Sequence, residues 1–436
     1  MTEKKKVLLV GQNPEVFSGN GNMLAKCIDE MDKEKYQISA FLQGQTPVEM
    51  IADIFDLNAT AATQSYLKTP VIPAYDVHSG DPWGKQKLIN VLYHHKIDIL
   101  LFVGIDIWRY AEIFDHIQNL QKRKGFIWKA VVPYDLDHIR NDWLYWLNYP
   151  DQVYVYSEFG YNMVKDHLDN VKFFRPVPEF VDVYQPGTEE EKESVRKAMF
   201  PDISKDTTVF YYVGNNQLRK NIYNTIKGFA EAYHERMQNG KEDLTLYLHI
   251  DNPDQVISLE RLQTELEVPD GAIRHSAGES RKLWPFELAA LMKGIDCHLL
   301  FSLQEGLSWT VIETKLAGIP SIISDSTAHK DWEKFMEEND KENPIIYAEQ
   351  DEGHFLPLMT SFGVGYIRTK ASSPYAIKES VLHYLRDKKD KNKVDEMRQE
   401  AVAISQQWLH SCHNFNNDVL EDEVKTRTKK DFGEVL

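Results

Sequence analysis

The feature that most constrains the fold is the repeated pairing of a short apolar run with a helical pattern. The run 6–11 (KVLLVG) is almost entirely apolar and ends in glycine, as is typical of a strand buried on both faces of a sheet. A polar loop containing Gly19 and Gly21 follows, and a helical pattern begins at about Met23. This alternation predicts βαβ units with a mostly parallel sheet, and hence an α/β fold.

The alternation occurs in two successive series. The first series predicts further strands at 36–42, 98–103, 128–133 and 153–157. The second predicts strands at 208–214, 244–250, 297–302 and 320–324, and helices at 221–236 and 309–317. A proline-bearing stretch ending at Gly187, followed by the charged run 189–193, predicts a linker and a first exposed helix. Two more helical patterns lie at 378–386 and 394–412. We therefore expect two α/β domains, residues 1–187 and 188–393, and a charged tail over 416–436.

Composition narrows the function classes. The 436 residues are 42% hydrophobic and 27% charged, values typical of a globular protein. A formal charge of −17 argues against sequence-independent binding of nucleic acid, although a local basic pocket stays open. The three cysteines are far apart in the sequence, which predicts no disulfide framework, no zinc site and a cytoplasmic location. Nothing approaches the roughly 20 apolar residues of a membrane helix.

The most specific motif is the segment 305–313 (EGLSWTVIE), which lies between a predicted strand and a predicted helix. A Gly-Leu-Ser turn at a helix N-terminus offers backbone N–H groups and a positive dipole to a diphosphate. Glu305 and Glu313 are then separated by about 12 Å along the helix axis, the span from a sugar to a ribose. The alternative is two solvated acidic side chains. The strand, the turn, the helix and the following Ala-Gly-Ile-Pro together favour a nucleotide-sugar site.

A second motif, 213–221 (VGNNQLRKN), also follows a predicted strand and opens a helix. Arg219 and Lys220 would neutralise charge that builds up on a leaving phosphate, Arg by bidentate contact and Lys as a point charge. Alone, the pair would be read as a basic pair on a surface loop.

These motifs resemble those of retaining GT-B glycosyltransferases, and glycosyltransferase family 4 in particular. The segment 305–313 matches the E-x7-E of that family, and 214–221 matches its G-R-x-x-x-R-K-N/G segment. The segments 18–23, 154–164 and 178–186 match its N-terminal glycine loop, its strand-Ser-helix and the stretch leading into its linker. Five matches in the expected order are more specific than any one of them, and they span most of residues 4–415.

The resemblance implies two Rossmann-like domains facing across a cleft. The N-terminal domain would bind the acceptor, the C-terminal domain would bind the donor, and the helix within 394–415 would pack back on the first domain. Lys220 and Arg219 would contact the diphosphate, Glu313 the ribose and Glu305 the donor sugar. The other expected donor contacts are Gly306, Leu307, Ser308, Thr310, Gly214, Asn215, Gly19, Asn20 and Gly21. The resemblance also implies transfer without a metal and without a further cofactor.

The sequence departs from the family pattern at two places. Asn215 stands where the family has an arginine, so phosphate stabilisation would rest on Arg219 and Lys220. The usual histidine after the strand at 128–133 is absent, and its place falls near Asp135, with His138 three residues later. Two interpretations stay open: either Asp135 or His138 takes over the catalytic role, or both are loop residues.

The acceptor side is less well defined. Asp137, His138 and Trp143 are candidate contacts. The first two lie near the place of the absent family histidine, and the flat ring of Trp143 suits a sugar face. The spacing of Trp143, Trp146 and Tyr149 is also that of a buried helix face, and we favour this core interpretation.

We predict transfer of a hexose from a UDP- or GDP-sugar to an acceptor hydroxyl, with retention of configuration. The alternatives are a catalytically silent GT-B scaffold or another GT-B enzyme, such as a nucleotide-sugar epimerase. The sequence leaves open the donor, the oligomeric state and the acceptor, which could be a glycan, lipid, protein, metabolite or modified nucleic-acid base.

Overall fold

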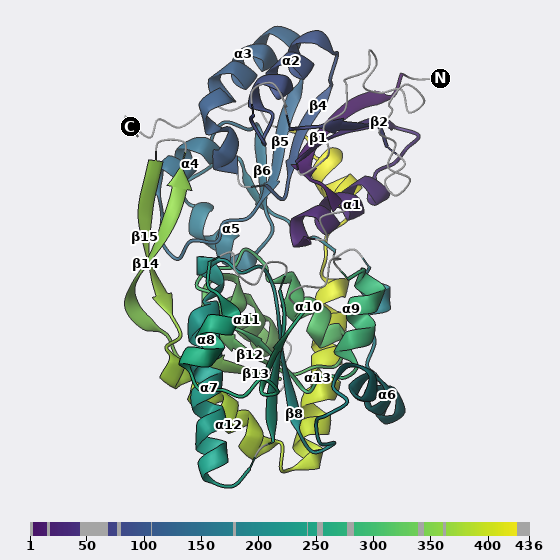
Figure 1. The fold of residues 1–436 in the computed structure, drawn as a ribbon. Helices are drawn as coiled ribbons and strands as arrows, with labels where there is room; N and C mark the ends of the chain where they lie inside the picture. Colours follow the sequence, from purple (N-terminus) through teal and green to yellow (C-terminus); the bar gives the residue numbers. More distant parts are fainter. Residues whose placement is uncertain are drawn as a thin grey trace. The chain divides into compact units, whose positions relative to one another are not determined.

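In the computed structural model, the described residues are 3–14, 18–43, 69–75, 80–105, 107–177, 180–241, 243–250, 256–276, 283–338, 344–360 and 363–424. They form two compact units. One comprises residues 1–179, 359–365 and 412–436, and the other comprises 180–358 and 366–411. Each unit is built around its own parallel sheet (Figure 1).

The first unit contains a seven-stranded sheet in the order β3-β2-β1-β4-β5-β6-β7. The strands are β1 (Lys5–Gln12), β2 (Tyr36–Gln43), β3 (Val71–Pro73), β4 (Ile99–Val103), β5 (Ile127–Val132), β6 (Gln152–Val155) and β7 (Val171–Phe173). The helices are α1 (Gly19–Glu30), α2 (Lys85–His94), α3 (Phe114–Lys124), α4 (Asn141–Leu147) and α5 (Glu158–Val164). Every pairing is parallel, and Val7 to Val10 in β1 are fully buried, as the apolar run predicted.

The second unit repeats this design with six strands in the order β10-β9-β8-β11-β12-β13. The strands are β8 (Thr208–Val213), β9 (Leu244–His249), β10 (Ile273–His275), β11 (Cys297–Leu300), β12 (Ser321–Ser324) and β13 (Ile345–Ala348). The helices are α6 (Glu189–Met199), α7 (Ile222–Gln238), α8 (Leu259–Glu265), α9 (Pro285–Met292), α10 (Trp309–Leu316), α11 (Lys330–Glu338), α12 (Pro374–Asp387) and α13 (Lys391–His410). The prediction of two α/β domains with parallel sheets is confirmed.

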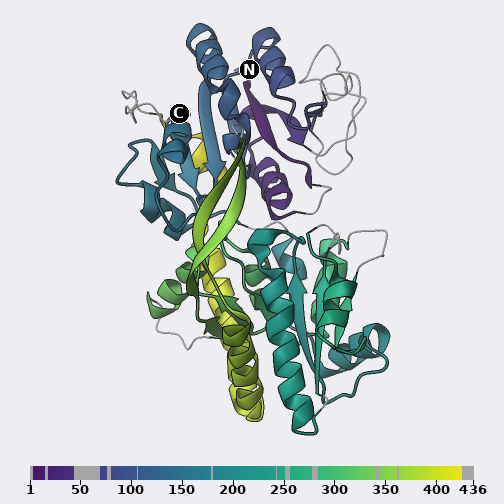
Figure 2. The same cartoon turned by 60° about the vertical axis from the view of Figure 1, so that its left-hand side comes forward.

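Several elements have no counterpart among the predicted ones, for example the edge strand β13. The strands β14 (Asp351–Thr360) and β15 (Gly363–Ala371) form a separate two-stranded sheet, visible in Figure 2 as a twisted ribbon. The strands β3, β7 and β10 have only three residues each, too few for a hydrophobic period to be read.

The end of the chain is divided between the units. Helix α13 belongs to the second unit, where it packs along α10. Its packing on the first unit stays a prediction. Residues 412–424 belong to the first unit, and Val419 and Leu420 are buried there. The Lys129 ammonium donates to the carbonyl of Val419 at 2.6 Å, so the beginning of the predicted tail is anchored. Residues 425–436 of that tail lie outside the described part.

Within the described residues, no helix is both long and apolar enough to cross a membrane.

Candidate functional site

The two predicted motifs meet at one edge of the second sheet. Strands β8 and β11 are parallel neighbours, and the strand order reverses between them. Gly214 directly follows β8, and Glu305 follows β11 after a short loop. In an open parallel sheet, the carboxyl ends of strands at such a reversal form the usual ligand-binding crevice. The arrangement therefore brings both motifs to the position where a ligand site is expected.

Glu305 is held between the two basic residues of the other motif. Its carboxylate forms an ion pair with the Lys220 ammonium and lies 3.5 Å from the Arg219 guanidinium. Glu305 is only 6% exposed. Burial alone would raise the pKa of Glu305, but the charges of Lys220 and Arg219 outweigh it and lower the pKa to about 2. The carboxylate is therefore ionised and fixed in place at neutral pH.

Arg219 and Lys220 occupy a separate turn ahead of α7. The 3-10 helix η4 (Leu218–Lys220) ends at Asn221, which has a left-handed φ of 54°, and α7 begins at Ile222. The basic pair was predicted to open the helix itself. The turn is tied to the other motif by backbone, since Leu303 N–H donates to the Arg219 carbonyl at 2.7 Å. This bond places the basic pair beside Glu305.

The N-terminus of α10 presents several buried polar atoms. Ser308 adopts a left-handed conformation (φ 64°, ψ 65°), and its side chain does not cap the helix. The Ser308 and Thr310 hydroxyls and the Gln304 side-chain nitrogen have no hydrogen-bond partner among the described residues. Buried polar atoms without partners are rare in folded proteins. Together with the N-terminus of α10, whose dipole is positive, they form a surface suited to an anionic, oxygen-rich ligand.

Glu313 lies two turns along α10 in an environment opposite to that of Glu305. It is 8% exposed, and its charged neighbours among the described residues do not include a cation that lowers its pKa. Burial raises its pKa to about 8, against a smaller opposing effect of the hydrogen bond from the Tyr184 hydroxyl. The two carboxylates of one motif are thus driven to opposite protonation states at neutral pH.

Three contributors to the site were missed by sequence reasoning. The Thr327 hydroxyl accepts from Glu305 N–H at 2.8 Å, and Thr327 itself has a positive φ of 39°. His329 is fully buried, and its charged form would further lower the pKa of Glu305. Tyr184 contacts Glu313. The available signal was positional: Thr327 and His329 follow β12, whose carboxyl end adjoins that of β11.

The glycine at the start of the second motif is structurally constrained. Gly214 has φ 154°, and an added Cβ would lie 3.0 Å from the Tyr212 hydroxyl. Asn215, which replaces the family arginine, is exposed. Gly306 is half-buried and Leu307 is buried at the entry to α10. These positions adjoin Glu305 in the chain, and their contact with a donor stays a prediction.

The predicted glycine loop of the first unit is the first turn of a helix. Helix α1 begins at Gly19, four residues earlier than its apolar pattern predicted, because the Ser18 hydroxyl caps it by accepting from Gly21 N–H at 3.1 Å. An added Cβ on Gly21 would lie 2.8 Å from the Asn13 carbonyl oxygen. Asn20 lies 3.5 Å from the Tyr156 hydroxyl. Gly21 therefore allows close packing within the first unit, and the contact of Gly19, Asn20 and Gly21 with a donor stays a prediction.

The candidate acceptor residues follow β5. Asp137 and His138 form a pair with 2.8 Å between carboxylate and ring nitrogen, and the Tyr134 hydroxyl donates to the His138 carbonyl. Asp135 is half-buried on the same loop. Trp143 is 3% exposed and stacks on Trp108 at 4.5 Å, which is the packing expected of a core residue. The roles of these four residues stay predictions.

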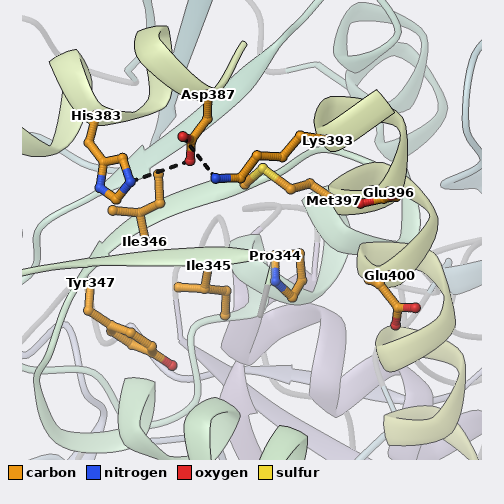
Figure 3. Close-up of a pocket in the computed structure, with 10 residues that line it drawn as sticks. All are labelled: Pro344, Ile345, Ile346, Tyr347, His383, Asp387, Lys393, Glu396, Met397 and Glu400. Atoms are coloured by element: carbon orange, nitrogen blue, oxygen red, sulfur yellow. Dashed lines mark ion pairs between the residues drawn. The ribbon is translucent and has the colours of Figure 1, made fainter. Parts of the chain in front are cut away.

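Figure 3 shows a cavity of about 470 Å³ elsewhere in the second unit. It lies between β13 and the helices α12 and α13, where Asp387 pairs with His383 and Lys393. None of its lining residues belongs to the predicted motifs. Among the described residues, no group of three His, Cys, Asp or Glu side chains is arranged to hold a metal ion. Metal-independent transfer stays a prediction.

No family model and no curated protein matches the sequence. Many solved structures match the fold. Anabaena HepE, solved in complex with UDP and glucose, is 12% identical with a TM-score of 0.63, over 96% of this chain and 98% of that chain. Sucrose-phosphate synthase from Thermosynechococcus elongatus is 11% identical with a TM-score of 0.61, over 93% and 95% of the two chains.

A UDP-forming α,α-trehalose-phosphate synthase from Burkholderia xenovorans is also similar. It is 10% identical with a TM-score of 0.57, over 96% of this chain and 98% of that chain. At these identities, the similarity establishes the fold. The resemblance found in the sequence is thereby confirmed at the level of architecture: the chain has the GT-B glycosyltransferase fold.

Proposed function

We propose that the protein is a glycosyltransferase that takes a hexose from a UDP-sugar and transfers it to an acceptor hydroxyl. The observation that carries the proposal is the ionised Glu305, fixed by Lys220 and Arg219 beside the polar N-terminus of α10. Similar folds support the choice of donor, since HepE was solved with UDP-glucose and another neighbour is UDP-forming. A GDP-sugar is the alternative donor that the motifs allow.

In the proposed complex, the donor diphosphate lies against the N-terminus of α10. Backbone N–H groups of Leu307 and Ser308 and the Thr310 hydroxyl donate to its oxygens. Arg219 and Lys220, which form ion pairs with Glu305, supply positive charge to the leaving phosphate. Glu305 accepts from sugar hydroxyls, and Glu313 accepts from the ribose.

The chemistry we propose is transfer with retention and without a metal. The protein supplies position and electrostatics, and the leaving diphosphate takes the acceptor proton. We propose that the first unit binds the acceptor through Asp135, Asp137 and His138.

A cytoplasmic location stays a prediction from the three separated cysteines.

The first test is calorimetric titration of UDP, GDP, ADP and CMP into the wild type, with Mg²⁺ and with EDTA. We expect one nucleotide to bind equally under both conditions and to lose at least tenfold in affinity in Glu313→Ala. Glu260→Ala, which removes an exposed carboxylate on α8, is the matched control and should bind like the wild type. If no nucleotide binds, the silent-scaffold alternative replaces our proposal.

A second test addresses catalysis and needs no acceptor. The protein is incubated with a sugar donor that carries the nucleotide found to bind, and free sugar should be released slowly. Proton NMR, recorded at once, shows from the anomeric signals whether the released sugar is the α- or the β-anomer. Retention appears as the α-anomer from an α-linked donor. Initial release of the β-anomer would contradict the retaining mechanism, and a total lack of hydrolysis with intact binding would favour the scaffold.

A further inference from the structure

The second unit has a second cavity, of about 390 Å³. It lies at the amino ends of the strands, whereas the candidate donor site lies at their carboxyl ends. Its lining includes Ile295, which precedes β11, and Ile319, which precedes β12. Glu305 follows the carboxyl end of β11, whereas these residues lie at the amino ends of the strands. The cavity also contacts the last turns of α9 and α10 and the side of α13. It is therefore a separate place from the nucleotide-sugar motifs.

The charges that line this cavity are all positive. Lys192 of α6, Lys293 after α9 and Arg398 of α13 line it, together with the amides of Gln399 and Gln406. No Asp or Glu is among the described residues that line it. The cavity of Figure 3 differs, because Asp387, Glu396 and Glu400 line it beside Lys393. The bias towards cations thus distinguishes this cavity from that of Figure 3.

Two of the three lining cations, Lys192 and Arg398, contact a single buried carboxylate. Asp296 is 1% exposed and lies behind the cavity, directly before β11. Its Oδ1 atom is 2.7 Å from the Lys192 ammonium and 3.7 Å from the Arg398 guanidinium. Arg196 and Lys388 contact its other oxygen. One negative charge therefore faces four positive ones.

The remaining carboxylates near these cations are on the surface and compensate little. Glu189 lies 3.7 Å from Arg398 with 78% of its side chain exposed, and Glu191 pairs with Lys293 at 44% exposure. Exposed ion pairs are weak because water screens them. Burial, together with the charge of Arg398, lowers the pKa of Lys192 even though Asp296 opposes the change. The cavity thus has an excess of positive charge that an entering anion would neutralise.

The rest of the cavity is apolar. Met292, Ile295 and Ile319 are buried beneath it, and Val402 and Ala403 of α13 form part of its wall. Gly318 has φ 70°, and an added Cβ would lie 3.4 Å from Pro186 and 3.5 Å from Val402. A charged wall next to an apolar floor suits a ligand that has one strongly anionic group and a ring or aliphatic body.

We propose that this cavity binds a small phosphate monoester, with the phosphate on Lys192, Lys293 and Arg398 and its organic body on the apolar floor. Guanidinium and ammonium groups are the usual partners of phosphate oxygens in proteins. The cavity volume is in the range of pockets that hold small metabolites. The site is independent of the donor site, and it stands or falls separately from the proposed transfer reaction.

The test is calorimetric titration of phenyl phosphate, inorganic phosphate and phenol into the full-length protein. Phenyl phosphate should bind at least tenfold more tightly than either fragment, because only it engages both the cations and the apolar floor. Arg398→Gln and Lys293→Gln should each weaken phenyl phosphate at least fivefold. Lys388→Gln is the matched control: Lys388 also contacts Asp296 but does not line the cavity, so its loss should leave binding within twofold.

A steric variant makes the test independent of charge. Ala403→Phe fills the cavity from α13 and should abolish phenyl phosphate binding, while circular dichroism confirms that the variant is folded. Four results would each overturn the proposal: no binding of phenyl phosphate, equal weakening by Lys388→Gln, unchanged binding in Ala403→Phe, or displacement of phenyl phosphate by UDP, which would place it in the donor site.

Discussion

Replacing Glu313 by glutamine should make the ligand-free protein more stable at neutral pH. Glu313 is buried within α10, and burial raises its pKa from 4.5 to about 8. In the unfolded chain, the same carboxyl group ionises near its ordinary pKa. Between these two values the folded state holds a proton that the unfolded state has released, so stability falls as pH rises. Glutamine keeps the shape and the contact with Tyr184 but has no proton to release.

The size of the effect follows from the same values. Each pH unit between 4.5 and about 8 costs the wild type about 1.4 kcal/mol, so the cost at pH 7 is about 3 kcal/mol. The pKa shift of Glu305 affects stability in the opposite direction. Its pKa is lowered to about 2, so its ionised form stabilises the fold by about 3 kcal/mol at any pH above its ordinary value of 4.5. That contribution decreases as pH falls below 4.5 and is lost once pH has fallen through about 2.

The assay is urea unfolding followed by circular dichroism at pH 5, 6, 7 and 8. We expect Glu313→Gln to exceed the wild type by less than about 1 kcal/mol at pH 5 and by about 3 kcal/mol at pH 7. Glu305→Gln is the matched control in the same motif. It should be less stable than the wild type by an amount that does not change with pH over this range. If the stability difference between Glu313→Gln and the wild type is constant with pH, the reasoning is refuted.

Three further predictions concern the ligand site and the thiols. UDP binding at pH 7 should release up to about one proton, because ribose hydroxyls that donate to Glu313 favour its ionised form. Calorimetry in HEPES and in Tris measures this release, and equal enthalpies after correction for dilution would contradict it. Lys220→Gln should slow UDP-sugar hydrolysis by about 10²–10³, whereas Lys241→Gln, at an exposed position after α7, should not; equal rates in both variants would remove Lys220 from the mechanism. The native thiols should react slowly with DTNB, since Cys27 and Cys297 are buried and burial raises the pKa of Cys412 to about 12, and three thiols should react after unfolding; rapid labelling of the native protein would contradict this.

The long central strands could be predicted from the sequence because their signal is local. Runs such as 208–214 and 297–302 are mostly apolar, and strands β8 and β11 lie within them. The short strands at the sheet edges and the β14–β15 hairpin were missed. A strand of three residues carries no readable period, and its pairing depends on a neighbour far along the chain.

The candidate site shows the same division. Residue type and spacing were sufficient to select Glu305, Glu313, Arg219 and Lys220, because glycine turns and helix starts are encoded locally. Thr327 and Tyr184 were not selected, since their contacts with the two carboxylates arise only when separate segments are brought together.

The sequence by itself determined the two α/β halves and the residue types at the carboxyl ends of β8 and β11. Only the tertiary structure decided what those residues are chemically. Glu305 is ionised because the folded chain brings Lys220 and Arg219 to it, and Glu313 is protonated because the fold buries it without a cation that lowers its pKa among the described residues. The four cations around Asp296 likewise come from two helices, α6 and α13, and from the end of a third, α12. Spacing is a property of the chain, whereas burial and the sum of nearby charges are properties of the folded molecule.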